Sequence, residues 1–204
     1  MKKILCLIDT LGVGGGAERQ MLGLAIFLKE KGYDVDLVAY HNEVSYVELI
    51  RQANLNVEIL NVKNSKWAKL CAVRQYIKSS GGYDCVIAYK DGASIISCLL
   101  KLLGDKFRLI VSERNTNQGI SKRDRLKFFL YRFADYIVPN AHAQEEFIKQ
   151  NFPQLKNKVV TITNYTDTSH FHPVETVSNN KLNVLTVGTD IVDGFISAAQ
   201  QHCP

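Results

Sequence analysis

Apolar residues along the chain gather in short runs, and glycine-rich or polar turns separate these runs from longer stretches with helical spacing. The runs are typical of strands at 4–8, 35–39, 57–60, 85–88, 109–111, 136–138 and 159–162. Helical spacing occurs between them, at 17–28, 47–53, 67–77, 93–103, 125–133 and 143–150. Because strands and helices alternate, we predict an α/β fold, built on a doubly wound and mostly parallel sheet.

The first strand leads into a glycine-rich turn and then into a helix. After the run 4–8 the sequence reads Leu11-Gly12-Val13-Gly14-Gly15-Gly16, and the helix opens at Ala17-Glu18-Arg19. Glycines let a backbone approach a ligand closely, and the unpaired N–H groups of a helix N-terminus attract anions. The candidate binding residues of this turn are therefore Gly14, Gly15, Gly16, Glu18 and Arg19.

The same turn matches G-x-G-x-x-A, the spacing of a dinucleotide-binding loop, from Gly12 to Ala17. A dinucleotide site also needs an acidic residue at the end of the second strand, where it binds a ribose. Here that end is Tyr40-His41, and Asp36 lies inside the strand. An NAD(P)-binding oxidoreductase is therefore the alternative interpretation, and the spacing alone favours it only weakly.

Read with its flanks, the turn is more specific. A strand ending in Asp-Thr-Leu, then Gly15-Gly16-Ala17-Glu18, a helix with Leu24 and Leu28, and Lys31-Gly32-Tyr33-Asp34-Val35 resembles the N-terminal, Rossmann-like domain of GT-B glycosyltransferases of family 4. Further segments resemble the family in the same order. They are Ser112-Glu113-Arg114-Asn115, Ala134-Asp135-Tyr136-Ile137-Val138, Asn164 with Asp167-Thr168 and Phe171-His172-Pro173, and Leu185 to Gly188.

The resemblance implies transfer of a hexose or N-acetylhexosamine from a nucleotide-sugar, with retention, to a saccharide or lipid-linked acceptor in polysaccharide or cell-envelope glycan synthesis. It implies no cofactor besides the nucleotide-sugar co-substrate, and no metal. By this resemblance, the glycine turn is expected to be the loop that binds the donor phosphate and the acceptor. Many members carry His after the fourth strand, where this chain has Tyr89-Lys90, so the catalytic group stays unassigned.

Polar residues also follow the later strands. Because ligands of open α/β sheets bind beyond the carboxyl ends of the strands, these residues are candidates for an acceptor-side rim. Arg114 could bind a phosphate through paired hydrogen bonds, and Glu113 could accept one from a sugar hydroxyl. A structural ion pair for Glu113 and Arg114, and a solvated loop for Lys90, are the alternatives. The rim candidates are Tyr89, Lys90, Glu113, Arg114, Asn115, Asn140 and Asn164.

The resemblance also divides the chain. Residues 1–171 are expected to form the acceptor-side domain, 172–181 a linker, and 182–204 the opening strand and helix of an incomplete donor-binding domain. The family's donor domain supplies an Arg, a Lys and a paired-glutamate motif that are not found here. We therefore expect the 204-residue chain to be catalytically silent alone, or else to be a non-catalytic binding subunit that borrows a donor domain from a partner.

Composition adds a mild basic balance, a formal net charge of +5, which suits phosphate-bearing ligands and is too small for a nucleic-acid-binding protein. An odd number of cysteines without a CxxC pair indicates reduced thiols and a cytoplasmic protein. The basic and aromatic stretch 122–133 could contact the inner face of an anionic membrane. However, Leu126, Phe129, Leu130 and Phe133 follow i, i+3, i+4, i+7, so we predict that they face the core.

Overall fold

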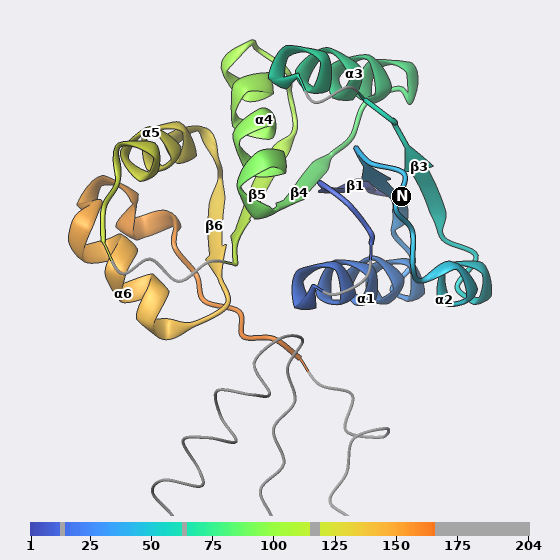
Figure 1. The fold of residues 1–204 in the computed structure, drawn as a ribbon, viewed down its shortest axis with the longest axis horizontal. Coiled ribbons are helices and arrows are strands. Elements are labelled where there is room, and N and C mark those ends of the chain that lie inside the picture. The colour runs from blue at the N-terminus through green and yellow to red at the C-terminus, as the bar shows by residue number, and fades with distance from the viewer. Residues whose placement is uncertain (13–14, 63–64, 115–118, 166–204) are drawn as a thin grey trace, which may run out of the picture. The chain divides into compact units, whose positions relative to one another are not determined.

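A computed structural model of the chain describes residues 1–12, 15–62, 65–114 and 119–165. Six strands form one parallel sheet in the order β3-β2-β1-β4-β5-β6, which confirms the predicted fold class (Figure 1). The predicted linker, the predicted second-domain elements, Gly14 and Asn115 all lie outside the described residues. The strands are β1 (Lys3–Ile8), β2 (Asp34–Ala39), β3 (Asn56–Ile59), β4 (Cys85–Tyr89), β5 (Arg108–Glu113) and β6 (Tyr136–Pro139).

Helices cover both faces of this sheet. Side chains of α1 and α2 pack in one core cluster, and those of α3, α4 and α5 pack in the other. Figure 1 shows α1 and α2 on the opposite side of the strands from α3 and α4. The helices are α1 (Gly16–Glu30), α2 (Val47–Gln52), α3 (Lys66–Ser79), α4 (Lys90–Leu102), α5 (Lys122–Leu130) and α6 (His142–Asn151), with 3₁₀ helices η1 (Tyr131–Phe133) and η2 (Pro153–Lys158).

The central strand β1 explains why its sequence is apolar without alternation. Leu5 and Leu7 join the cluster beneath α3 and α4, whereas Cys6 and Ile8 join the cluster beneath α1. All four side chains are fully buried. A parallel strand between two helical layers must be apolar on both faces, and this is the pattern that the sequence carries.

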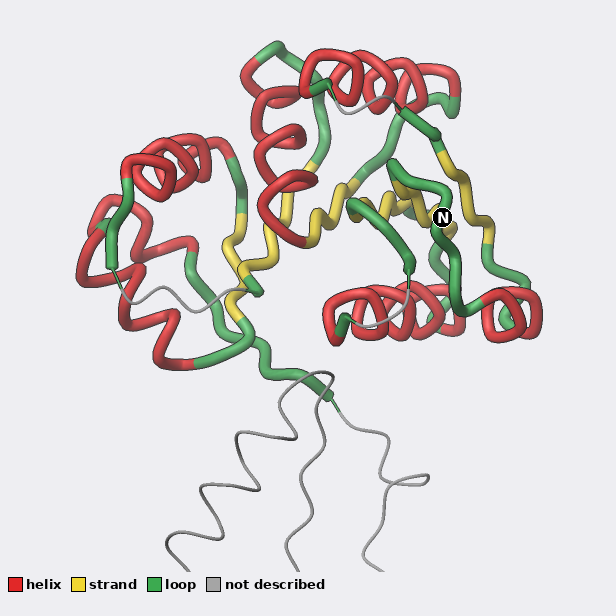
Figure 2. Tube along the Cα trace, in the orientation of Figure 1, coloured by secondary structure: helices red, strands yellow, loops and turns green. Residues whose placement is uncertain are grey.

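One predicted strand and one predicted loop were wrong. Residues 159–162 do not form a strand: Val159 makes a single parallel bridge to Ile137, and two further backbone hydrogen bonds follow along β6. Figure 2 draws this segment as loop. Val159 is buried, whereas Val160 and Ile162 are exposed. Residues 90–92, predicted as a loop, form the first turn of α4, because β4 turns directly into that helix.

The predicted core face of α5 was right for Leu130, which is buried, and for Phe133, which packs against the core, but wrong for its other two residues. Leu126 and Phe129 are 61% and 54% exposed, whereas Phe128 is fully buried and Lys127 is 2% exposed. A capping box between Ser121 and Asp124 fixes where the helix begins. From that start Lys127 points inward to carboxylates, so the helix presents Lys127 and Phe128 to the interior. Apolar spacing alone could not indicate a buried lysine.

Phe128 and its neighbour Phe129 test this assignment. Phe128 stacks on Phe152 with ring centroids 4.3 Å apart, so Phe128→Ala leaves a cavity and should lower the free energy of unfolding by about 3–5 kcal/mol. Phe129→Ala, on the exposed side, should change it by no more than about 0.5 kcal/mol. Urea unfolding followed by circular dichroism measures both. Equal losses from the two variants would show that the helix face is wrongly assigned.

Candidate functional site

The carboxyl ends of the six parallel strands lie along one edge of the sheet, and the predicted site residues sit at these ends. Glu18 belongs to the first turn of α1, Lys90 begins α4, and Arg114 follows β5. Asn140 follows β6 and is half-buried, and Arg19 is exposed on the first turn of α1. The structure therefore gathers these five candidates on one rim, and their part in binding stays a prediction.

Glu18 and Lys90 form an ion pair that joins the glycine turn to the end of β4. The Nζ of Lys90 donates a hydrogen bond to Oε1 of Glu18, and the Glu18 side chain is only 4% exposed. The carboxylate lies against Gly15, where a Cβ would overlap its Oε2 atom. A larger residue at position 15 would therefore displace the Glu18 carboxylate, although the backbone φ of −114° is one that any residue adopts.

Arg114 ties three segments of the rim together. Its guanidinium lies 4.2 Å from the centroid of the Tyr89 ring, and its Nη1 donates to Oδ1 of Asn164 at 2.6 Å. The next residue, Tyr165, accepts a hydrogen bond at its carbonyl from Gln20 of α1, at 3.0 Å. The ends of β4 and β5 and the start of α1 are therefore connected through 164–165. Burial raises the pKa of Tyr89, and Arg114 offsets part of that rise.

Glu113, predicted as a rim residue that meets ligand, lies beneath the rim at 1% exposure. Its Oε2 is 2.8 Å from the Nζ of Lys127, and Tyr131 also donates to it at 3.4 Å. The Lys127 ammonium also lies 3.3 Å from Asp91 Oδ1, in the first turn of α4. Glu113 is thus in a buried ion pair, as the alternative interpretation expected, although its partner is Lys127 of α5 and not Arg114.

Asp9 is a rim residue that the sequence analysis did not select. It follows β1, and its side chain lies against Gly92, where a Cβ would come within 2.5 Å of Oδ1. Burial raises the pKa of the Asp9 carboxyl, while Lys69, Lys90 and His41 partly offset the rise. The signal was available in the sequence: an acidic residue directly follows a buried parallel strand, at the edge where ligands bind.

The dinucleotide interpretation finds no acidic residue at the end of β2. Asp36 lies inside the strand, 6% exposed, and accepts hydrogen bonds from the Tyr83 hydroxyl and the Asn56 side chain. Lys3 also lies 3.7 Å from it. A carboxylate so engaged inside the strand does not reach a ribose at the strand's end.

A comparison with protein families identifies the family to which this fold and rim belong. The sequence profile described as Glycosyltransferase Family 4 matches residues 14–170, which include all the rim elements from α1 onward. The chain belongs to Glycosyltransferase Family 4. The resemblance noted from the sequence motifs is thereby confirmed, together with the Rossmann-like half of a GT-B fold.

Curated relatives of this family member are glycosyltransferases. The chain is 29% identical over 186 residues to an alpha-1,3/1,6-mannosyltransferase ALG2 of Yarrowia lipolytica, covering 78% of this chain and 40% of that protein. It is 25% identical over 210 residues to the N-acetylgalactosamine-N,N'-diacetylbacillosaminyl-diphospho-undecaprenol 4-alpha-N-acetylgalactosaminyltransferase of Campylobacter jejuni, covering 92% and 55%. The chain spans about half the length of the curated relatives it matches.

Solved structures agree on the fold of this family member. A structure of Anabaena Alr3699/HepE in complex with UDP and glucose has a TM-score of 0.66 at 19% identity, covering 83% of this chain and 46% of that one. A glycosyltransferase from Rickettsia africae ESF-5 has a TM-score of 0.67 at 14% identity, covering 98% and 49%. This Glycosyltransferase Family 4 chain therefore matches about half the length of each of these larger proteins.

Lys127 provides a test of the buried charges beneath the rim. Lys127→Met removes the ammonium that lies 2.8 Å from the buried Glu113 carboxylate, and should lower the free energy of unfolding by about 3–5 kcal/mol. Lys149→Met breaks an exposed Lys–Glu pair on α6 and should cost at most about 1 kcal/mol. Chemical unfolding measures both. A loss from Lys127→Met no larger than the loss from Lys149→Met would contradict the buried network.

Proposed function

We propose that the described domain is the acceptor-side half of a glycosyltransferase. In this proposal a hexose or N-acetylhexosamine moves from a nucleotide-sugar, with retention and without a metal, to a saccharide or lipid-linked acceptor. The observation that carries the proposal is the family match across 14–170, which contains the rim. Two kinds of protein support it: the curated glycosyltransferase relatives, and the structural neighbour that holds UDP and glucose.

Catalysis at such a rim depends on positioning and on stabilising the departing diphosphate. The glycine turn offers backbone N–H groups at the start of α1, where partial positive charge favours an anion. Arg114 adds a guanidinium whose orientation is fixed by Tyr89 and Asn164, so little side-chain freedom remains to be lost on binding. In the proposal these groups bind phosphate oxygens, while the neighbouring polar residues orient sugar hydroxyls.

The first test separates this proposal from the nicotinamide-dependent oxidoreductase. We expect UDP-sugars, GDP-sugars or saccharides to raise the melting temperature of the purified chain, since a ligand that binds only the folded state stabilises it. NAD and NADP should leave the melting temperature unchanged. Stabilisation by a nicotinamide dinucleotide, with none by any nucleotide-sugar or saccharide, would overturn the proposal.

A second proposal is that transfer needs donor contacts that the described residues do not supply. The family places most contacts to the donor in a second domain, and the described residues form one α/β domain. A sugar-transfer assay on the purified 204-residue chain, with a panel of nucleotide-sugars, is expected to give no turnover. Turnover at about 1 s⁻¹ or faster, which is ordinary for enzymes, would contradict it. Turnover that appears only when a separate donor-domain chain is added would instead support the alternative, in which the chain is a non-catalytic binding subunit.

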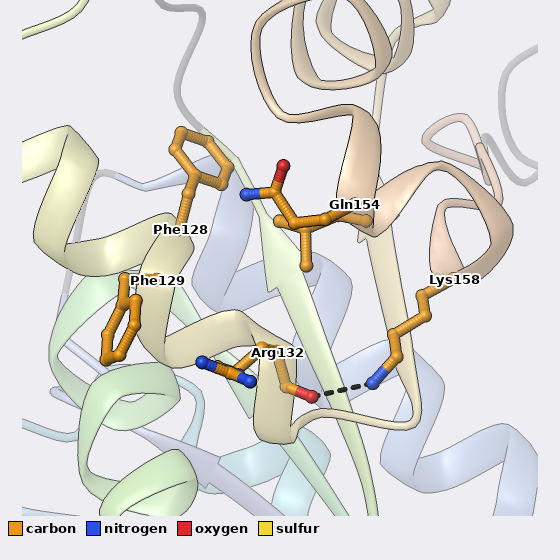
Figure 3. A pocket seen from close by; sticks show the side chains of 6 residues that line it. Phe128, Phe129, Arg132, Gln154 and Lys158 are labelled. Carbon is orange, nitrogen blue, oxygen red and sulfur yellow. Dashed lines mark hydrogen bonds between the residues drawn. The ribbon is translucent and has the colours of Figure 1, made fainter.

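We further propose that α5 contacts an anionic membrane surface. Lys122, Arg125, Leu126 and Phe129 follow helical spacing and are all exposed, so basic and apolar side chains share one side of the helix. Arg132 continues this side and lies over the Phe129 ring at 5.3 Å. Figure 3 shows Phe129 and Arg132 at one wall of a pocket, opposite Gln154 and Lys158. No described helix is long and apolar enough to cross a bilayer.

Vesicle binding tests the α5 surface. The chain should sediment with vesicles containing phosphatidylglycerol and much less with vesicles of phosphatidylcholine alone, because the exposed charges are basic. Leu126→Ala combined with Phe129→Ala should weaken binding at least about threefold, since apolar area is lost. Phe27→Ala on α1 is a matched control, because Phe27 is 52% exposed. Equal binding by the double variant and the wild type would exclude this contact.

A further inference from the structure

The helices that follow β1 and β4 leave the sheet on opposite faces, although the two strands are neighbours. β1 leads to α1, beneath one face, and β4 leads to α4, on the other (Figure 1). In open α/β sheets, ligands bind beyond the carboxyl ends of the two strands at which such a reversal occurs, and we call this region of the chain the crevice. Asp9 follows β1 and Lys90 follows β4, so both stand at the mouth of this crevice.

Lys90 adopts a backbone conformation that costs energy. Its φ is +68°, in the left-handed region that residues other than glycine rarely adopt. The other non-glycine residues with positive φ in the described part of the chain are Asn54 and Asn61, and asparagine tolerates this region. Strain of this kind persists where the surrounding structure enforces it, commonly at binding sites. The sharp turn from β4 into α4 brings the Lys90 side chain across to α1.

Glu18 holds the Lys90 side chain there. One carboxylate oxygen accepts the hydrogen bond from Lys90, and the other, Oε2, has no hydrogen-bond partner among the described residues. Glu18 is only 3% exposed, so leaving one of its carboxylate oxygens without a hydrogen bond costs folding free energy. A ligand that donates a hydrogen bond to this oxygen would remove that cost. Glu18 thus fixes the ammonium and adds a buried acceptor next to Gly15.

Asp9 supplies the third polar group of the crevice. Its carboxylate faces the first turn of α4 at Gly92, and the charged groups around it are Lys69, Lys90, His41 and Asp91. Asp91 is itself engaged by Lys127 and Arg123. At the ends of β1 and β4, Glu18 therefore pairs with Lys90, while Asp9 lies near both Lys90 and Lys69.

We propose that Asp9, Glu18 and Lys90 form a binding site for a hydroxyl group of a neutral sugar. A carboxylate only accepts hydrogen bonds and an ammonium only donates them, whereas a hydroxyl does both. A sugar hydroxyl can accept from Lys90 and donate to Asp9, with Glu18 as the positioning residue. A phosphate fits better at Arg114, because Glu18 already neutralises Lys90, whereas Asn164 and Tyr89 beside Arg114 are neutral. This inference rests on the proposed glycosyltransferase function and adds which group meets the sugar.

The sugar could belong to the nucleotide-sugar or to the acceptor, and calorimetric titration of the purified chain distinguishes them. The probes are UDP, UDP-glucose, UDP-N-acetylglucosamine, and the methyl α-glycosides of glucose, mannose, galactose and their N-acetylamino counterparts. The variants are Asp9→Asn, Lys90→Met and Glu18→Gln. Lys101→Met is the matched control, since Lys101 pairs with Asp135 at the far end of the same helix. Thermal unfolding shows whether each variant is folded.

We expect Asp9→Asn and Lys90→Met each to weaken sugar binding about tenfold, the usual effect of losing a hydrogen bond to a charged group. UDP affinity and the control should be unchanged. Weakening for methyl glycosides assigns the site to the acceptor, and weakening for UDP-sugars but not UDP assigns it to the transferred sugar. Should Lys90→Met fail to fold, Asp9→Asn, which keeps the side-chain shape, gives the answer.

Two results would overturn the inference while leaving the proposed function intact. One is a wild type that binds sugars while folded Asp9→Asn and Lys90→Met bind them equally well. The other is an equal loss of UDP affinity, which would make the crevice a phosphate site. A wild type that binds neither UDP-sugars nor any methyl glycoside would contradict the proposed function, and the inference with it.

Discussion

The parallel pairing of β1 with both β2 and β4 is the constraint on which the rest of the structure depends. It places every strand's carboxyl end on one edge, so residues far apart in sequence meet there without any long loop. It also reverses the side on which the following helices pack, and the crevice arises at that reversal. The fully buried, apolar β1 satisfies this geometry because helices cover it on both faces.

Buried charge joins the rim to α5. Lys127 neutralises Glu113 at the end of β5 and Asp91 at the start of α4, so one side chain links three elements. A buried ion pair adds little net stability compared with apolar packing, but removing one partner is costly. We infer that this pair fixes relative positions: it holds the basic, exposed side of α5 at a set place with respect to Arg114 and Lys90.

Apolar runs predicted the sheet and its helices because a strand covered on both faces leaves a plain signal, as 4–8 and 85–88 do. The Gly15–Glu18 turn predicted the start of α1 and, through its flanks, the family. The inward side of α5 could not be predicted, since Lys127 is buried by partners that come from α4 and β5. For the same reason Glu113 was assigned to the ligand-binding rim, and Asp9 was missed beside a more conspicuous glycine turn.

The central claim is that this edge of the sheet binds sugar and nucleotide. Backbone amide chemical shifts of the labelled chain, recorded while a UDP-sugar and a saccharide are added, test it most directly. The account predicts shifts concentrated at Asp9, Glu18, Lys90, Arg114 and Asn164, at the carboxyl ends of the strands. Shifts confined to the opposite edge, around Asp84 and Asp135, or no shifts with any sugar ligand, would contradict it.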